Sequence, residues 1–249
     1  NEPIRNYEPG SPEKASLKEK LTELSQKEIE IPLIISGKEV RTGDTGTCIM
    51  PHNHGHVLAT FHQAGEKEVH QAIESAQEVW KQWSTTPLHD RAQIFLKMAE
   101  LLTGPYRDII NAATMLNMSK NVFQAEIDAA CELIDFFKFN VQYMAQLYKE
   151  QPESSSGIWN RMEHRPLEGF VFAITPFNFT SICANLCAAP AMLGNVIVWK
   201  PADSQVYSAE VIMELFKAAG LPDGVINMIT VNGPTAGDII FKHSDFSGL

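Results

Sequence analysis

Two polar side chains follow directly on apolar runs in the second half of the chain. The run Phe170–Ile174 is broken by Pro176, and Asn178 follows the break. The run Val196–Trp199 ends in Lys200. Because side chains at the carboxyl ends of parallel strands line the ligand crevice of a doubly wound sheet, the sequence predicts that Asn178 and Lys200 face one cleft.

Each of these residues also has a simpler alternative role. The Asn178 amide could donate a hydrogen bond to an oxyanion that develops on a carbonyl carbon, or the residue could cap the following helix. Lys200 could bind a phosphate or a ribose hydroxyl, or it could be a solvated surface lysine. Asp203, three residues on, could accept a hydrogen bond from a ribose or simply begin the next helix.

A segment of small residues, Gly233–Gly237, marks the start of a further helix, with Pro234 in its first turn. Small residues allow an anion to approach a helix N-terminus closely. The segment alone is weak evidence. The usual Gly-x-Gly-x-x-Gly dinucleotide fingerprint is absent from the chain, so a nicotinamide cofactor would have to be held in another way.

Three other groups suggest sites less strongly. The histidines of Pro51–His56 share one face of an alternating segment, but they lack Cys or acidic neighbours and favour a hairpin turn over a metal site. Cys183 and Cys187 share a helix face and favour two small buried residues over a metal pair. Glu132 stands among apolar residues and could line a pocket or lie on a solvated helix face. We expect no bound metal.

These candidate residues need a scaffold of alternating strands and helices. From 169 to 249 the pattern predicts three strand–helix repeats, which is typical of an α/β protein with right-handed βαβ units in a parallel sheet and an exposed apolar edge. Helical periodicity dominates 66–150. The stretch 151–168 is polar and predicts an exposed excursion. Residues 1–65 predict a surface arm followed by short antiparallel hairpins.

The composition excludes several classes of protein. The 249 residues carry a formal net charge of -10, which argues against a nucleic acid or an anionic membrane surface as partner. No apolar run reaches the ~20 residues of a membrane-spanning helix. Four cysteines in a chain of this size do not form a disulfide framework, so we expect a reducing compartment.

Four segments together resemble the aldehyde dehydrogenase superfamily in order and spacing: Thr175–Phe179, Trp199–Asp203, Gly220–Asn227 and Gly233–Gly237. Four segments are similar to the delta-1-pyrroline-5-carboxylate dehydrogenases within it: Asn53–His56, Asp90–Lys97, Gln124–Ala130 and Pro176–Thr180, which overlaps the first of the segments above. The resemblance covers nearly the whole chain. It implies a Rossmann-like cofactor domain that binds NAD⁺, and oxidation of L-glutamate γ-semialdehyde to glutamate in the mitochondrial matrix.

The resemblance also implies roles for single residues. Asn178 matches the oxyanion-stabilising asparagine, Lys200 matches the lysine at the adenosine ribose, and Glu132 matches a position near the substrate end of the aldehyde tunnel. The segment 151–168 matches a strand that helps to pair subunits, which implies a homo-oligomer. The remaining positions matched to the cofactor site are Thr175, Pro176, Phe177, Asp203, Gly233 and Gly237.

Two catalytic motifs of the superfamily have no match here. The nucleophilic cysteine belongs to a Gly-Gln-x-Cys segment and the general-base glutamate to a Gly-Gly-Lys segment, and neither occurs in these 249 residues. We therefore expect this polypeptide to be the amino-terminal part of an enzyme and to be inactive by itself. The alternatives are a non-catalytic short form that binds nucleotide or full-length subunits, and a different aldehyde dehydrogenase.

Overall fold

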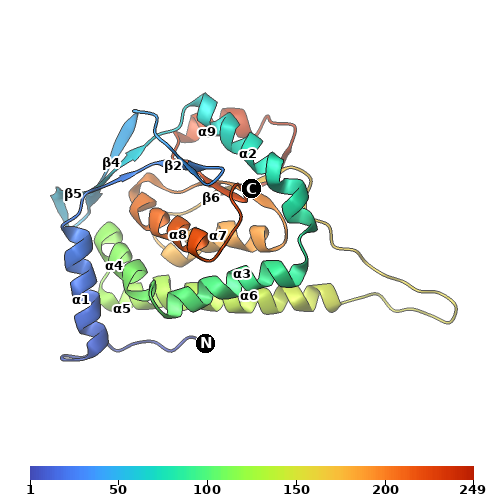
Figure 1. The fold of residues 1–249 in the computed structure, drawn as a ribbon, viewed down its shortest axis with the longest axis horizontal. Coiled ribbons are helices and arrows are strands. Elements are labelled where there is room, and N and C mark those ends of the chain that lie inside the picture. The colour runs from blue at the N-terminus through green and yellow to red at the C-terminus, as the bar shows by residue number, and fades with distance from the viewer.

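The computed structural model describes residues 1–249, which form two sheets and nine α-helices (Figure 1). The helices are α1 Pro12–Ser25, α2 Glu66–Thr85, α3 Leu88–Thr103, α4 Arg107–Met118, α5 Val122–Ala125, α6 Glu132–Lys149, α7 Thr180–Met192, α8 Val206–Ala218 and α9 Gly233–Ile240. The strands are β1 Ile29–Ile31, β2 Leu33–Ile35, β3 Lys38–Val40, β4 Thr45–Met50, β5 Asn53–His62, β6 Phe170–Ile174, β7 Val196–Lys200, β8 Ile226–Met228 and β9 Phe246–Gly248. A π-helical turn, Glu126–Cys131, joins α5 to α6, and a 3₁₀ turn, Asp203–Gln205, precedes α8.

The larger sheet contains six strands in the order β3-β2-β8-β7-β6-β9. The four strands from β8 to β9 are parallel, whereas β2 is antiparallel to both of its neighbours. The apolar runs of β6, β7 and β8 are almost entirely buried, as expected for strands covered on both faces. The predicted α/β class and the three strand–helix repeats are confirmed.

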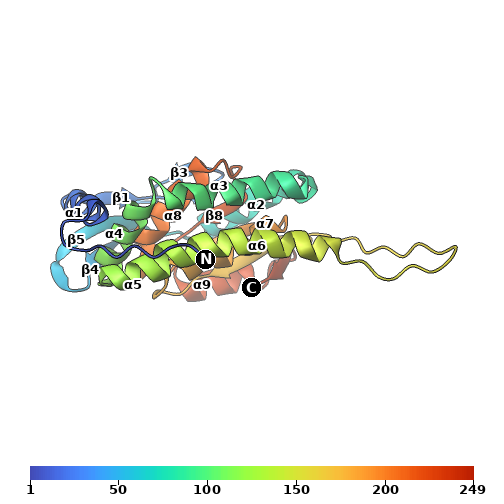
Figure 2. The same cartoon turned by 90° about the horizontal axis from the view of Figure 1, so that it is seen from below.

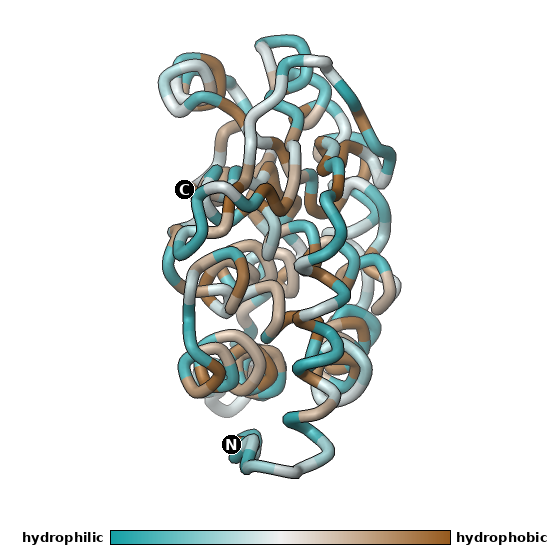
Figure 3. Tube along the Cα trace, turned by 90° about the vertical axis from the view of Figure 1, so that its left-hand side faces the viewer, coloured by the Kyte–Doolittle hydropathy of each residue, from teal (hydrophilic) through white to brown (hydrophobic).

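Helices cover both faces of this sheet (Figure 1). One face carries α2, with α9 packed beside it, and the other carries α7 and α8. Helices α3, α4 and α6 form a further layer against α7 and α8, and Figure 2 shows α3 and α6 side by side. Apolar and polar residues alternate around the coils in Figure 3, as amphipathic helices require. One core of 56 buried residues runs through sheet and helices, so the layers form a single body.

The first 65 residues differ from the expected antiparallel hairpins. Strand β1 pairs with β5 in parallel, and only β4 and β5 are antiparallel in the smaller sheet, β1-β5-β4. The β2–β3 hairpin joins the larger sheet, where Ile34 pairs with Met228 of β8. Since β9 also pairs with β6, neither side of the three predicted parallel strands is the open apolar edge that we expected. Alternation identifies a strand but not its partner.

The segment between α6 and β6 projects from the body as a long arm (Figures 1 and 2). Residues 150–167 contain neither helix nor strand, in agreement with the predicted exposed excursion. Its apolar side chains are open to solvent, and Trp159 is 77% exposed. None of the helices combines the length and the apolar character that crossing a bilayer requires.

Candidate active site

Three strands end at one edge of the larger sheet. In the β6–β7 register Ile174 lies opposite Lys200, and the Thr175 N–H donates to the Lys200 carbonyl at 3.1 Å. On the other side of β7 the Ile229 N–H donates to the Trp199 carbonyl at 2.8 Å. The segments that follow β6, β7 and β8 therefore leave from a shared edge, where sheets of this kind form their ligand crevices.

The Thr175 side chain faces the interior. Its hydroxyl oxygen accepts a hydrogen bond from the Trp199 indole at 2.9 Å and lies 3.3 Å from the Cys183 sulfur. These contacts occupy the side chain, so only the backbone of Thr175 remains for a ligand at the edge. The next two residues lead outward, because Pro176 is half-buried and Phe177 is 65% exposed.

Asn178 is exposed on the turn between β6 and α7. The N-cap of α7 is Phe179, and no side chain caps this helix. The capping alternative for Asn178 is therefore wrong. The Asn178 backbone carbonyl accepts a hydrogen bond from the Lys120 ammonium at 2.5 Å, while its side-chain amide has no hydrogen-bond partner within the chain. The amide is thus a free donor at the sheet edge.

Lys200 and Asp203 lie at the end of β7. Lys200 is half-buried and no carboxylate of the chain lies within ion-pair distance of its ammonium. Asp203 is exposed at the start of the 3₁₀ turn. The N-cap of α8 is Gln205, because the Gln205 N–H donates to the Ala202 carbonyl at 2.8 Å and α8 begins only after this turn. The edge therefore offers a cation and a separate carboxylate to a ligand.

The N-terminus of α9 is open. A Cβ atom placed on Gly233 would meet nothing within 4 Å, and one on Gly237 would lie 3.4 Å from the Phe241 ring. The N-cap residue, Asn232, makes no capping hydrogen bond with its side chain. The first backbone N–H groups and the positive end of the helix dipole are consequently accessible to an anion.

Glu132 begins α6 directly after the π-helical turn. It is half-buried, its carboxylate accepts a hydrogen bond from the Ser181 hydroxyl of α7, and it lines a groove of about 460 Å³ together with Ile127, Phe136 and Tyr143. Glu132 therefore borders a groove, which favours the pocket alternative over a fully solvated helix face. π-helical turns are frequent at functional sites, and this one directs Glu132 toward the start of α7, close to the Asn178 turn.

The sequence did not identify Lys120 or Asp128, which contact the same turn. The Lys120 ammonium forms an ion pair with Asp128, which lies in the π-helical turn, and also stands 4.2 Å from the centre of the Phe179 ring. Burial raises the pKa of Asp128, the Lys120 hydrogen bond opposes this shift, and the Glu132 charge adds to it. No local pattern indicates that residue 120 lies beside residue 178, so a single sequence held no signal for this contact.

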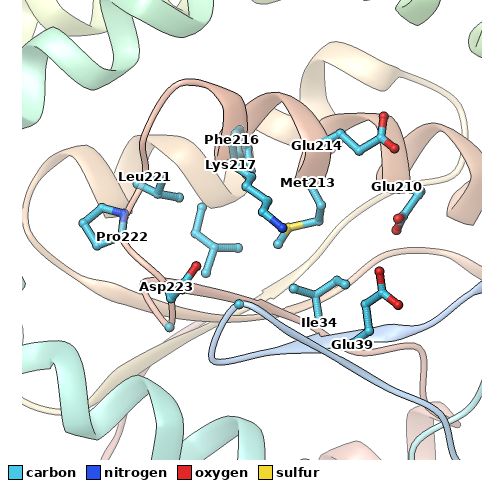
Figure 4. A pocket seen from close by; sticks show the side chains of 13 residues that line it. Ile34, Glu39, Glu210, Met213, Glu214, Phe216, Lys217, Leu221, Pro222 and Asp223 are labelled. Atoms are coloured by element: carbon cyan, nitrogen blue, oxygen red, sulfur yellow. The ribbon is translucent and has the colours of Figure 1, made fainter.

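A second cavity lies away from this site, beside the β2–β3 hairpin of the sheet. It has a volume of about 180 Å³ and is lined by α8, the loop before β8 and the β2–β3 hairpin (Figure 4). Glu39, Glu210 and Glu214 stand along it, and none of the predicted site residues does. Burial, followed by the charges of Glu214 and Glu39, raises the pKa of Glu210 to about 7.

None of the four cysteines is an exposed thiol. Burial raises the pKa of Cys48 to about 11 and those of Cys131 and Cys183 to about 12, and it also raises that of Cys187. Cys183 and Cys187 are fully buried in α7, which confirms the structural interpretation of this pair. No three His, Cys, Asp or Glu side chains gather in a way that could hold a metal ion.

Comparisons of the sequence and of the structure with known proteins agree on one family. Residues 39–249 match the model of the aldehyde dehydrogenase family. The delta-1-pyrroline-5-carboxylate dehydrogenase of Agaricus bisporus is 50% identical over 92% of this chain and 42% of its own length, and the human mitochondrial protein of that name is 43% identical over 100% of this chain and 44% of its own length. A crystal structure of the Mycobacterium tuberculosis delta-pyrroline-5-carboxylate dehydrogenase bound with NAD has a TM-score of 0.97 and 45% identity, over 98% of this chain and 46% of that one. The chain spans about half the length of the relatives it matches.

Proposed function

Because the chain belongs to the aldehyde dehydrogenase family, we propose that it forms the cofactor-binding part of an NAD⁺-dependent dehydrogenase. The proposed reaction oxidises L-glutamate γ-semialdehyde, the open form of 1-pyrroline-5-carboxylate, to glutamate. The observation that carries the proposal is that the segments holding Asn178, Lys200 and the α9 N-terminus leave one edge of one sheet. The names of the relatives supply the substrate and the cofactor.

The residues at this edge suit a dinucleotide. The unpaired Lys200 ammonium would donate to ribose hydroxyls, and Asp203 would accept from one. The open N-terminus of α9, with Gly233 leaving room for close approach, would hold the pyrophosphate. Thr175, Pro176 and Phe177 would contribute backbone and apolar contacts, and Gly237 would keep the first turns of α9 narrow. When bound, NAD⁺ supplies the hydride acceptor of the reaction.

The free amide of Asn178 would stabilise negative charge on the aldehyde oxygen. Such a donor is oriented before the reaction and is worth about 10²–10³ in rate. Glu132 would border the path of the aldehyde, since its groove opens beside the start of α7. The hydrogen bond from Ser181 fixes the direction of the Glu132 carboxylate.

The nucleophile of the reaction would come from outside these 249 residues. A thiol attacks as its thiolate, and burial keeps all four cysteines here protonated at neutral pH. We therefore propose that the 249-residue polypeptide alone does not turn over aldehyde. The assay compares it with the longer protein that contains this chain, with NADH formation as readout. Turnover by the 249 residues alone would refute this part of the proposal.

Substrate and site are tested in the longer protein. We expect a higher kcat/KM for glutamate γ-semialdehyde than for hexanal, and a preference for the latter would indicate a different aldehyde dehydrogenase. In Asn178→Ala, kcat should fall about 10²–10³-fold while the affinity for NAD⁺ stays the same. An unchanged kcat would remove Asn178 from the mechanism.

The arm between α6 and β6 is proposed to pair subunits in a homo-oligomer. Ile158, Trp159 and Met162 are 59%, 77% and 48% exposed, which is unusual for large apolar side chains on an isolated surface. Trp159→Ser should shift the protein to a smaller species in size-exclusion chromatography, and an unchanged elution volume would argue against the arm. Because several of the relatives are named as mitochondrial, we propose the mitochondrial matrix as the location.

A further inference from the structure

We propose that Lys120 is a positioning residue that sets the direction of the Asn178 amide through the backbone of Asn178. The inference rests on the proposed function, because it matters only if that amide meets the reacting carbonyl oxygen. It adds a residue from a distant part of the chain to the site at the sheet edge.

The surroundings of Lys120 hold its ammonium in one place. The residue follows α4, whose C-cap, Ser119, has a left-handed backbone with φ of 54° and turns the chain toward the sheet edge. The Lys120 side chain is only 15% exposed. Its ammonium reaches the Asn178 carbonyl at 2.5 Å, pairs with Asp128 and stands over the Phe179 ring. An ammonium has three donors and no acceptor, so these contacts use most of its capacity.

Asn178 itself has no other hydrogen bond to hold it. The hydrogen bond from Lys120 is the only one that Asn178 forms within the chain. No side chain caps α7 at Phe179. The Asn178 carbonyl and the Asn178 side chain are attached to the same Cα atom, so a φ rotation or a displacement of this residue that releases the carbonyl also moves the amide. The catalytic value of a donor depends on its direction before the reaction, and a misplacement of about 1 Å can cost about 100-fold in rate.

The ion pair explains why a lysine stands here. Asp128 is buried, and one of its carboxylate oxygens has no hydrogen-bond partner. A buried carboxylate requires a neutralising cation. Lys120 supplies this cation and thereby anchors the Asn178 turn to the π-helical turn that also precedes Glu132. One ammonium thus links the proposed oxyanion donor to the element that borders the proposed aldehyde path.

A double-mutant cycle in the full-length dehydrogenase tests the inference, with Lys120→Met, Asn178→Ala and the double variant. We expect Lys120→Met to lower kcat about 10- to 100-fold while the dissociation constant for NAD⁺ stays within about twofold. If Lys120 acts through Asn178, the double variant has the same kcat as Asn178→Ala. A merely structural lysine would instead give losses that multiply, and that result, or an unchanged kcat in Lys120→Met, would overturn the inference.

Two further variants keep the test decisive. Lys120→Gln retains a donor for the Asn178 carbonyl without the charge, so its kcat should lie between those of the wild type and Lys120→Met. If Lys120→Met folds poorly, Lys120→Gln takes its place in the cycle. Lys97→Met is the matched control. Its ammonium also pairs with a carboxylate, at 3.0 Å from Glu100, but its side chain is 46% exposed and lies on α3, outside the proposed site. Its kcat should not change.

The cycle also separates this inference from the proposed substrate. If the full-length protein prefers another aldehyde, the substrate assignment fails, but the same cycle run with that aldehyde still reports on Lys120. If the singles prove additive with glutamate γ-semialdehyde as a good substrate, the inference about Lys120 fails and the proposed function stands.

Discussion

Glu210 gives the sharpest test of the electrostatics of this fold. Its carboxyl group lines the cavity of Figure 4 beside Glu214 of its own helix and Glu39 of the β2–β3 hairpin, and one of its oxygens is buried without a hydrogen-bond partner. Burial is the main cause that raises its pKa from 4.5 to about 7, and the two neighbouring carboxylates add to it. Lys217 is the one cation on the cavity wall. The substitution Glu210→Gln removes the charge and keeps the shape.

The sign and size of the effect follow from proton linkage. The folded state holds the Glu210 proton up to about pH 7 and the unfolded state only to 4.5, so stability falls as the pH rises between these values. One pKa unit corresponds to about 1.4 kcal/mol, so the free energy of unfolding falls by about 3 kcal/mol in total. About 2 kcal/mol of this decrease occurs between about pH 5.5 and pH 8. The raised pKa of Glu214 acts in the same direction and remains in the variant.

The assay is urea unfolding, followed by tryptophan fluorescence, at about pH 5.5 and pH 8. We expect the free energy of unfolding of Glu210→Gln, relative to that of the wild type, to be about 2 kcal/mol larger at the higher pH than at the lower. The pH difference is the readout because the cost of burying the neutral amide is the same at both. Glu74→Gln, at an exposed position on α2, is the control, and its free energy of unfolding should stay within about 0.5 kcal/mol of the wild-type value at both pH values. Equal pH slopes in Glu210→Gln and the wild type would refute the argument.

Three other tests concern the site and the scaffold. Lys200→Met should weaken NAD⁺ binding about 10- to 100-fold, the value of a hydrogen bond to a charged group, and leave kcat at saturating NAD⁺ nearly unchanged; an unchanged dissociation constant in a titration would contradict the ribose role. Arg107→Met should lower the free energy of unfolding by about 3–5 kcal/mol, since it leaves the fully buried Glu126 carboxylate without the guanidinium that now lies 2.5 Å away; a loss below about 1 kcal/mol in urea unfolding would show that the ion pair is not needed. Gly169→Ala should destabilise more than Gly220→Ala, although their φ values, 97° and 87°, are similar. A Cβ at 169 would collide with a backbone carbonyl before β9, whereas one at 220 meets nothing and adds only the left-handed strain of about 1–2 kcal/mol; equal unfolding midpoints would refute the steric explanation.

The sequence by itself determined the elements that carry the site. The runs that become β6 and β7 are continuous and apolar, and a strand buried on both faces needs such a run whatever its partners are. Gly220 follows the helix before β8 with a φ of 87°, a left-handed conformation that glycine adopts readily at helix ends. The positions of Asn178 and Lys200 after these runs then followed, because parallel strands share one carboxyl edge. All of these signals lie within a few neighbouring residues.

Only the tertiary structure decided which distant segments meet. Strand β2 pairs with β8, the Lys120 ammonium contacts the Asn178 carbonyl, and Glu39 of the β2–β3 hairpin faces Glu210. In each case the two partners are widely separated along the chain, and the local sequence of one does not specify the other. Residue type and periodicity fix local conformation and the side that is buried. The partner of a strand edge, or the ion that neutralises a buried carboxylate, is fixed by the packing of the whole core, which no short stretch of sequence encodes.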